Sequence, residues 1–241
     1  MILRKMRGEK GLPARASGWV PLILLLLFAA CSKEVADTSG VDREARLKIV
    51  HASVNAGAMD AYYNGVKRSD AAMNYTDTLG YFPAGRGTDL SVDFRVTGTV
   101  NAVASQLISL RSLRSYTVYL TGARSGEGYS GLRTILSSDT LTAPADGAAK
   151  IRIVHASPNA GRLDFYVGAD TVRRNVFYGQ VTYMRTTPAR EYTFSLTEPG
   201  TKTEVLSAKT TLESGGIYTF LLRGLRNNAT TPLTLQVLKN N

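Results

Sequence analysis

The chain has few of the residues that most often build active sites. Its 241 residues include one cysteine, one tryptophan and two histidines. A single cysteine excludes an internal disulfide framework. Two histidines with no carboxylate cluster beside them cannot complete the four-ligand shell of a zinc site. The only tryptophan, Trp19, lies in a segment that we expect to be removed, which disfavours a tryptophan platform for sugars. The composition therefore predicts no metal and no cofactor.

The single cysteine itself, Cys31, follows a pattern typical of export. Basic residues come first, then an apolar run of about ten residues, Trp19–Phe28, and the small pair Ala29–Ala30. The run is shorter than the ~20 residues that span a bilayer. The stretch before Cys31 resembles the bacterial lipobox, from which Phe28 departs. We expect residues 1–30 to be a lipoprotein signal peptide and Cys31 to carry a lipid anchor; the alternative is an ordinary secretory peptide with Cys31 as a stray thiol.

Residues 31–44 are mostly polar and small, which predicts a flexible tether between the lipid and the first folded domain. Ser32 is not the aspartate that keeps Gram-negative lipoproteins in the inner membrane. The resemblance therefore favours the outer membrane, on its periplasmic side or at the cell surface.

An internal repeat divides the rest of the chain. Residues 46–57 match residues 150–161 with an offset of 104, and residues 116–120 match residues 218–222 with an offset of 102. A period near 100 residues is too long for a solenoid unit and fits one compact domain per copy. We expect a first domain over 45–141, a linker over 142–148 and a second domain over 149–241.

Each copy has the pattern of an all-β domain. Short segments rich in Val, Ile, Tyr, Thr and Leu recur with Gly, Asn, Pro or Asp between them. Residues 90–96 alternate apolar and polar side chains, as a half-buried strand does. Asn64-Gly65 predicts a tight type I′ hairpin. About seven strands per copy indicate two tandem antiparallel β-sandwich domains, immunoglobulin-like in architecture but without the inter-sheet cysteines.

The repeated segments also resemble a known family. Val154-His155-Ala156-Ser157-Pro158-Asn159-Ala160, the strand at 163–167 and Gly216-Ile217-Tyr218-Thr219 are similar to the bacterial envelope domain of unknown function 4397. The first copy departs from the pattern at Val54 and at Arg114-Ser115. The resemblance implies a location and an architecture, and it brings no activity.

The two histidines, His51 and His155, fall at equivalent positions of the repeat. Strand alternation places His51 on the same face as Leu47 and Ile49, which we expect to be the core face. A histidine at the end of a buried strand usually bonds to nearby backbone, here the loops 53–57 and 157–161. We expect a structural role for both.

The other repeated polar residues flank these loops. Alternation predicts that Asp60 and Asp164 point outward, and we expect the serines and asparagines to shape the loops through local hydrogen bonds. No Gly-x-Ser-x-Gly elbow surrounds either serine, which disfavours a hydrolase. The structural repeat motif thus comprises His51, Ser53, Asn55, Asp60, His155, Ser157, Asn159 and Asp164.

The charge balance disfavours nucleic acid as a partner. The net charge of +10 falls to about +6 once residues 1–30 are removed, and the arginines of the remainder are scattered. The sequence predicts a non-catalytic envelope lipoprotein that acts in binding or scaffolding. A glycan-binding or adhesin-like protein is the alternative, and a hydrolase using His155 and Asp164 a remote one. A binder predicts a concave surface lined by Tyr and Arg, and an enzyme predicts His155 exposed beside Asp164. The partner, a glycan or an envelope protein, and the oligomeric state stay open.

Overall fold

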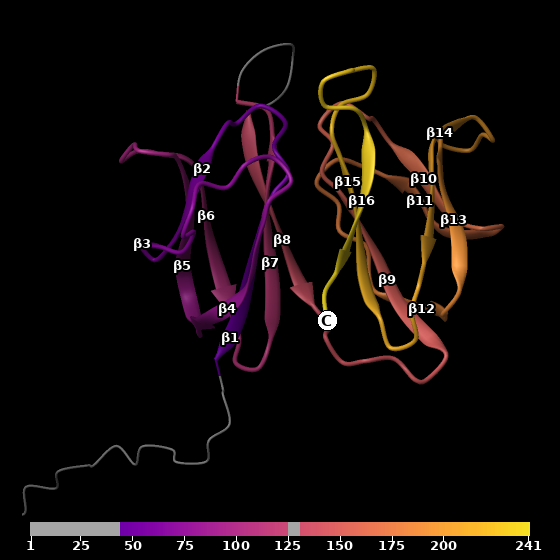
Figure 1. Cartoon of the computed structure of the whole chain (residues 1–241), viewed down its shortest axis with the longest axis horizontal. Helices are drawn as coiled ribbons and strands as arrows, with labels where there is room; N and C mark the ends of the chain where they lie inside the picture. Colours follow the sequence, from indigo (N-terminus) through magenta and orange to yellow (C-terminus); the bar gives the residue numbers. More distant parts are fainter. Residues whose placement is uncertain (1–43, 125–130) are drawn as a thin grey trace, which may run out of the picture. The chain divides into compact units, whose positions relative to one another are not determined.

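The structure is a computed structural model that describes residues 44–124 and 131–241. The expected signal peptide, Cys31 and nearly all of the expected tether lie outside these residues. The described part contains no helix and forms sixteen strands, eight in each copy of the repeat (Figure 1). The all-β prediction is therefore confirmed.

The strands of the first copy are β1 (Ala45–His51), β2 (Met59–Tyr63), β3 (Val66–Lys67), β4 (Thr78–Gly85), β5 (Gly87–Val96), β6 (Ala102–Leu110), β7 (Ser115–Gly122) and β8 (Leu132–Asp139). Those of the second are β9 (Ala148–His155), β10 (Leu163–Val167), β11 (Asp170–Val176), β12 (Arg185–Pro188), β13 (Glu191–Thr197), β14 (Glu204–Thr211), β15 (Ile217–Arg223) and β16 (Thr234–Lys239).

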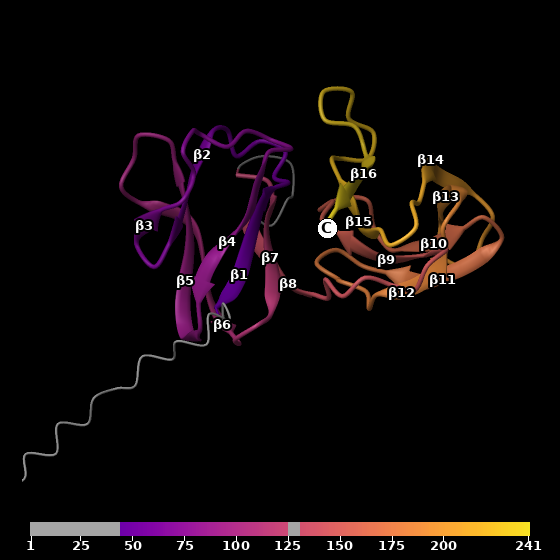
Figure 2. The ribbon, with the colours of Figure 1, turned by 60° about the horizontal axis from the view of Figure 1, so that its bottom comes forward.

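Each copy is a sandwich of two four-stranded sheets. The first copy has the strand orders β4-β1-β7-β8 and β3-β2-β5-β6, and the second has β12-β9-β15-β16 and β11-β10-β13-β14 (Figure 2). Eight strands per copy replace the expected seven. One strand that the pattern does not reveal is β3, whose two residues are both exposed. Such a short edge strand buries nothing that would mark it in the sequence.

One pairing in each copy differs from a purely antiparallel sandwich. Strand β1 pairs with β7 in parallel, and β9 pairs with β15 in the same way. Local hydrophobic alternation is the same in parallel and antiparallel strands, so it could not report this direction.

The hairpin predicted at Asn64-Gly65 is present. Asn64 and Gly65 have φ angles of 48° and 76°, and the flanking residue Tyr63 pairs with Val66. Positive φ at both central residues is the condition for a type I′ turn.

Each sandwich has its own apolar core, built from alternate residues of the facing sheets. In β5, Val92 and Phe94 are fully buried. In the second copy, the rings of Phe194 on β13 and Phe220 on β15 join the two sheets with centroids 3.9 Å apart. Burying side chains of this size contributes about 1.5–3 kcal/mol each, so each core can hold its pair of sheets together.

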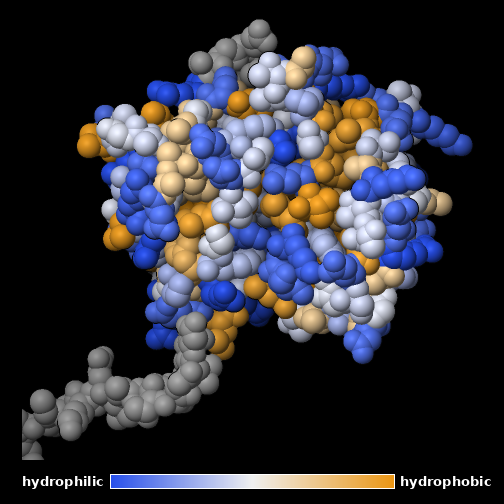
Figure 3. Space-filling view, viewed as in Figure 1, coloured by the Kyte–Doolittle hydropathy of each residue, from blue (hydrophilic) through white to orange (hydrophobic). Residues whose placement is uncertain are grey.

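A third apolar cluster joins the two copies, which belong to one compact unit, Val41–Asn241. It combines side chains from β1, β7 and β8 of the first copy with side chains from β9 and β15 of the second. The cluster consists of Val50, Ala52, Tyr119, Ile135, Val154, Ala156 and Leu221. One sheet of each copy is thus covered on both faces. Figure 3 shows apolar residues reaching the surface over β15 and β16, where Val237 and Leu238 on β16 are half-buried.

Candidate functional site

The two repeated histidines hold their loops. His51 and His155 are fully buried, and their Nε2 atoms donate to the carbonyl oxygens of Gly57 and Gly161, at 3.0 and 2.9 Å. Burial lowers the pKa of His51, and it lowers the pKa of His155 to about 4. Both rings are therefore neutral at pH 7. Buried and bonded to backbone, they lie where strand alternation predicts and offer no exposed nitrogen to a ligand.

The repeated serines and asparagines connect the same loops to the ends of β7 and β15. Ser53 and Ser157 donate to the carbonyl oxygens of Gly122 and Gly224, at 2.8 and 2.7 Å. The side-chain oxygens of Asn55 and Asn159 accept from the backbone amides of Arg124 and Arg226, at 2.6 and 2.8 Å. Both serines are fully buried, so neither is placed to act as a nucleophile.

The outward orientation expected for Asp60 and Asp164 is wrong. Asp60 is 5% and Asp164 is 1% exposed. Asp164 accepts from the backbone amides of Asn175 and Gly200, at 2.6 and 2.9 Å, and Asp60 forms an ion pair with Lys67 at 2.9 Å. Alternation fixes the face of the sheet but does not reveal the backbone that covers it.

The remote hydrolase arrangement does not form. His155 and Asp164 are both buried, and each is occupied by separate backbone partners. Across residues 44–124 and 131–241, no three His, Cys, Asp or Glu side chains gather where a metal ion could bind. The same residues contain no helix long and apolar enough to cross a membrane.

A buried polar network, which the sequence did not suggest, lies between the two copies. Arg152 on β9 is 1% exposed and forms an ion pair with Asp139 on β8. Its remaining N–H groups donate to Thr219 Oγ1 at 2.9 Å, to Ser138 O at 3.0 Å and to Tyr119 Oη at 3.3 Å. The guanidinium is thus hydrogen-bonded along its whole edge, as a buried charge requires.

The carboxylate of Asp139 is equally well supplied with donors. Tyr81 Oη donates to it at 2.6 Å, Thr117 Oγ1 at 2.5 Å and Ser137 Oγ at 3.0 Å. Lys48, the counterpart of Arg152 in the first copy, donates to Asn240 of the second copy at 2.9 Å. Residues that the repeat makes equivalent therefore reach across the same interface in both directions.

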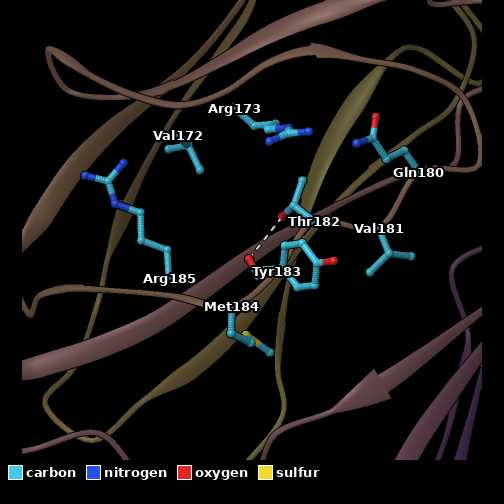
Figure 4. Close-up of a pocket in the computed structure, with 8 residues that line it drawn as sticks. All are labelled: Val172, Arg173, Gln180, Val181, Thr182, Tyr183, Met184 and Arg185. Atoms are coloured by element: carbon cyan, nitrogen blue, oxygen red, sulfur yellow. Dashed lines mark hydrogen bonds between the residues drawn. The ribbon is translucent and has the colours of Figure 1, made fainter.

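A shallow pocket of about 200 Å³ opens at one edge of the second sandwich (Figure 4). It lies between β11, at the edge of one sheet, and the segment 180–185 that leads into β12, at the edge of the other. Arg185 spans this edge, since its Nη1 donates to Thr171 O at 2.9 Å. The lining residues are Val172, Arg173, Gln180, Val181, Thr182, Tyr183, Met184 and Arg185. This is the concave surface lined by Tyr and Arg that distinguishes a binder from an enzyme.

Three solved structures resemble the chain distantly, each with a TM-score of 0.25. The Bacillus anthracis TIE protein shares 15% identity over 76% of this chain, which spans 34% of that protein. A family 26 carbohydrate-binding module of Eubacterium rectale Amy13K, in complex with maltoheptaose, shares 16% identity over 81% of this chain and 97% of its own. A streptococcal virulence factor described as binding alpha-glucan shares 13% identity, over 79% and 97% respectively. Likeness at this level says nothing of what this chain binds.

Comparison with curated proteins gives no match. The sequence profile of a "Domain of unknown function (DUF4397)" matches twice, over residues 45–166 and 149–241. These two matches cover the whole sandwich region and coincide with the two copies seen in the strand order. The chain therefore belongs to the DUF4397 family, with two copies of the domain in tandem.

Proposed function

We propose that the chain is a lipid-anchored protein of the bacterial cell envelope that acts at the outer membrane by binding or scaffolding, without catalysis. Its anchor is the lipid on Cys31, after removal of residues 1–30. The interface between the two copies carries the scaffolding part of this proposal. A third apolar cluster and the ion pair of Arg152 with Asp139 join the sandwiches into one unit, which suits a protein that presents surfaces at a fixed spacing.

The absence of catalysis is proposed from the use that the fold makes of its polar residues. His155, Ser157 and Asp164, which a hydrolase would need free, hold loops through backbone hydrogen bonds. A general base must reach the proton that it abstracts, and the fully buried ring of His155 does not.

The test of the anchor is the intact mass and membrane fractionation of the wild-type protein beside Cys31→Ala. Acylated mass and membrane association that are lost in Cys31→Ala support the proposal, and an unacylated wild-type protein contradicts it. Protease treatment of whole cells then separates the two sides of the outer membrane. Digestion places the sandwiches at the cell surface, and protection places them in the periplasm.

The pocket at the edge of the second sandwich favours glycan binding as a second candidate function. Tyr183 is 96% exposed there, beside two exposed arginines, Arg173 and Arg185. Aromatic rings and arginines are enriched at recognition surfaces, and a Tyr ring can lie against the face of a sugar.

A further inference from the structure

The pocket of the second copy has no counterpart of the same chemistry in the first. Arg185 pairs with Ile151 on β9, and the equivalent residue of the first copy, Phe82, pairs with Leu47 on β1. There the guanidinium of Arg68 lies over the Phe82 ring, 5.4 Å from its centroid. In the first copy an aromatic ring and an arginine thus pack together, whereas the second copy presents Arg185 to solvent.

The exposed groups of the pocket are ones that the fold does not use. Tyr183 is 96% exposed, so its ring packs against almost nothing. Its neighbour Thr182 is pinned to β9, because Thr182 N donates to Ile153 O at 2.9 Å and Ile153 N donates to Thr182 Oγ1 at 3.0 Å. The backbone beneath Tyr183 is therefore fixed while its ring is free to meet a ligand.

The charge at this edge is positive. Arg173 forms no ion pair with any residue that the structure describes. Arg185 has one distant carboxylate neighbour, Asp170, at 3.9 Å, and both of these side chains are well exposed. Figure 4 shows the two arginines and the Tyr183 ring around the same hollow. A planar guanidinium matches the geometry of a carboxylate and can bind it through two hydrogen bonds.

We propose that this edge binds an acidic pyranose, the uronate unit of an acidic polysaccharide. The ring of Tyr183 lies against the apolar face of the sugar, and Arg173 and Arg185 bind its carboxylate. Gln180 and Thr182 supply polar groups for the hydroxyls. The inference rests on the proposed binding function and names its ligand class. Phosphate, from a lipid headgroup or in solution, offers the same guanidinium a different anion and is an outcome of the test.

The test is calorimetric titration of the full-length acylated protein, held in neutral detergent, with trigalacturonate. Its methyl ester, which keeps the sugar faces and removes the charge, is the matched ligand. We expect trigalacturonate to bind and the ester to bind about tenfold more weakly, since a charge-assisted pair contributes on the order of a factor of ten or more. Higher salt should weaken only the acid, because salt screens exposed charges.

Variants assign the site. Arg173→Gln and Arg185→Gln should each weaken binding about tenfold, and Tyr183→Ala should do so while Tyr183→Phe keeps the affinity. Arg174→Gln is the matched control, since Arg174 is an exposed neighbour on β11 that does not line the pocket. Equal effects of Arg174→Gln and Arg173→Gln would show a general charge effect and overturn the site.

The remaining outcomes also decide. If trigalacturonate does not bind, the proposal is overturned. If inorganic phosphate or vesicles containing phosphatidylglycerol bind through the same arginines and uronate does not, the ligand is phosphate and the sugar is overturned. Failure here leaves the acylated mass of Cys31 unchanged, so it is distinguishable from failure of the proposed envelope function.

Discussion

The guanidinium of Arg152, in the second copy, and the carboxylate of Asp139, in the first, form an ion pair from which water is excluded. Lys48 and Asn240 make the reciprocal contact, in which a neutral amide takes the place of the carboxylate. The acceptors are secured in the same way, because Thr117 donates to Asp139 and Asn240 donates to Thr219. The repeat has therefore kept one interface contact in two versions, and only one of them carries two opposite charges.

The charged version predicts a large effect of a small change. Asp139→Asn should lower the free energy of unfolding by about 3–5 kcal/mol, because it leaves the buried Arg152 charge uncompensated. Denaturant unfolding measures the loss. The double variant Asp139→Leu with Arg152→Met, which removes both charges, should recover most of it. A single variant as stable as the wild type would contradict the inference that the pair joins the two copies.

Acid should weaken the fold through His155. Its pKa is about 4 in the folded protein and 6.5 in an unfolded chain. Between these values only the unfolded state takes up the proton, so stability is complete above pH 6.5 and is lost as pH falls toward 4. The loss is on the order of 3 kcal/mol at 1.36 kcal/mol per pKa unit. Urea midpoints at pH 7, 5.5 and 4.5 measure it.

The control for this pH dependence is His155→Gln, whose amide can still donate to Gly161 O but does not titrate. Its stability should change less between pH 6.5 and pH 4 than that of the wild type. His51, whose pKa burial also lowers, stays in both proteins and contributes the same trend. Parallel curves for the two proteins would mean that His155 does not carry the acid sensitivity.

Removal of the His155 side chain should destabilise the second copy at neutral pH. His155→Ala loses the hydrogen bond to Gly161 O and leaves that carbonyl unpaired, at a cost of about 1–3 kcal/mol. The melting temperature reports it. Unchanged stability together with a lost ligand would contradict the structural role of the histidine.

Some of this architecture could be predicted from the sequence, because it follows from local periodicity. The burial of His51 and the turn at Asn64-Gly65 depend on side chains within a few residues. The burial of Arg152 does not, since alternation places it on an outer face and only the distant first copy covers that face. Asp164 is similar, because loop amides far along the chain satisfy its carboxylate. The Tyr183 pocket also escaped prediction, since two edge strands meet there that no spacing relates.

The final prediction concerns Gly224, which accepts the hydrogen bond of Ser157. Its φ angle is +85°, and a Cβ at this position would collide with the backbone oxygen of Pro232. Gly224→Ala should therefore cost well over the ~1 kcal/mol of an ordinary positive-φ glycine, since rigid backbone must move. Gly200→Ala is the matched control, because Gly200 has a φ of +71° with open space around its Cβ. Denaturant unfolding of the two variants should separate the collision from the φ effect, and equal losses would show that the Pro232 backbone yields.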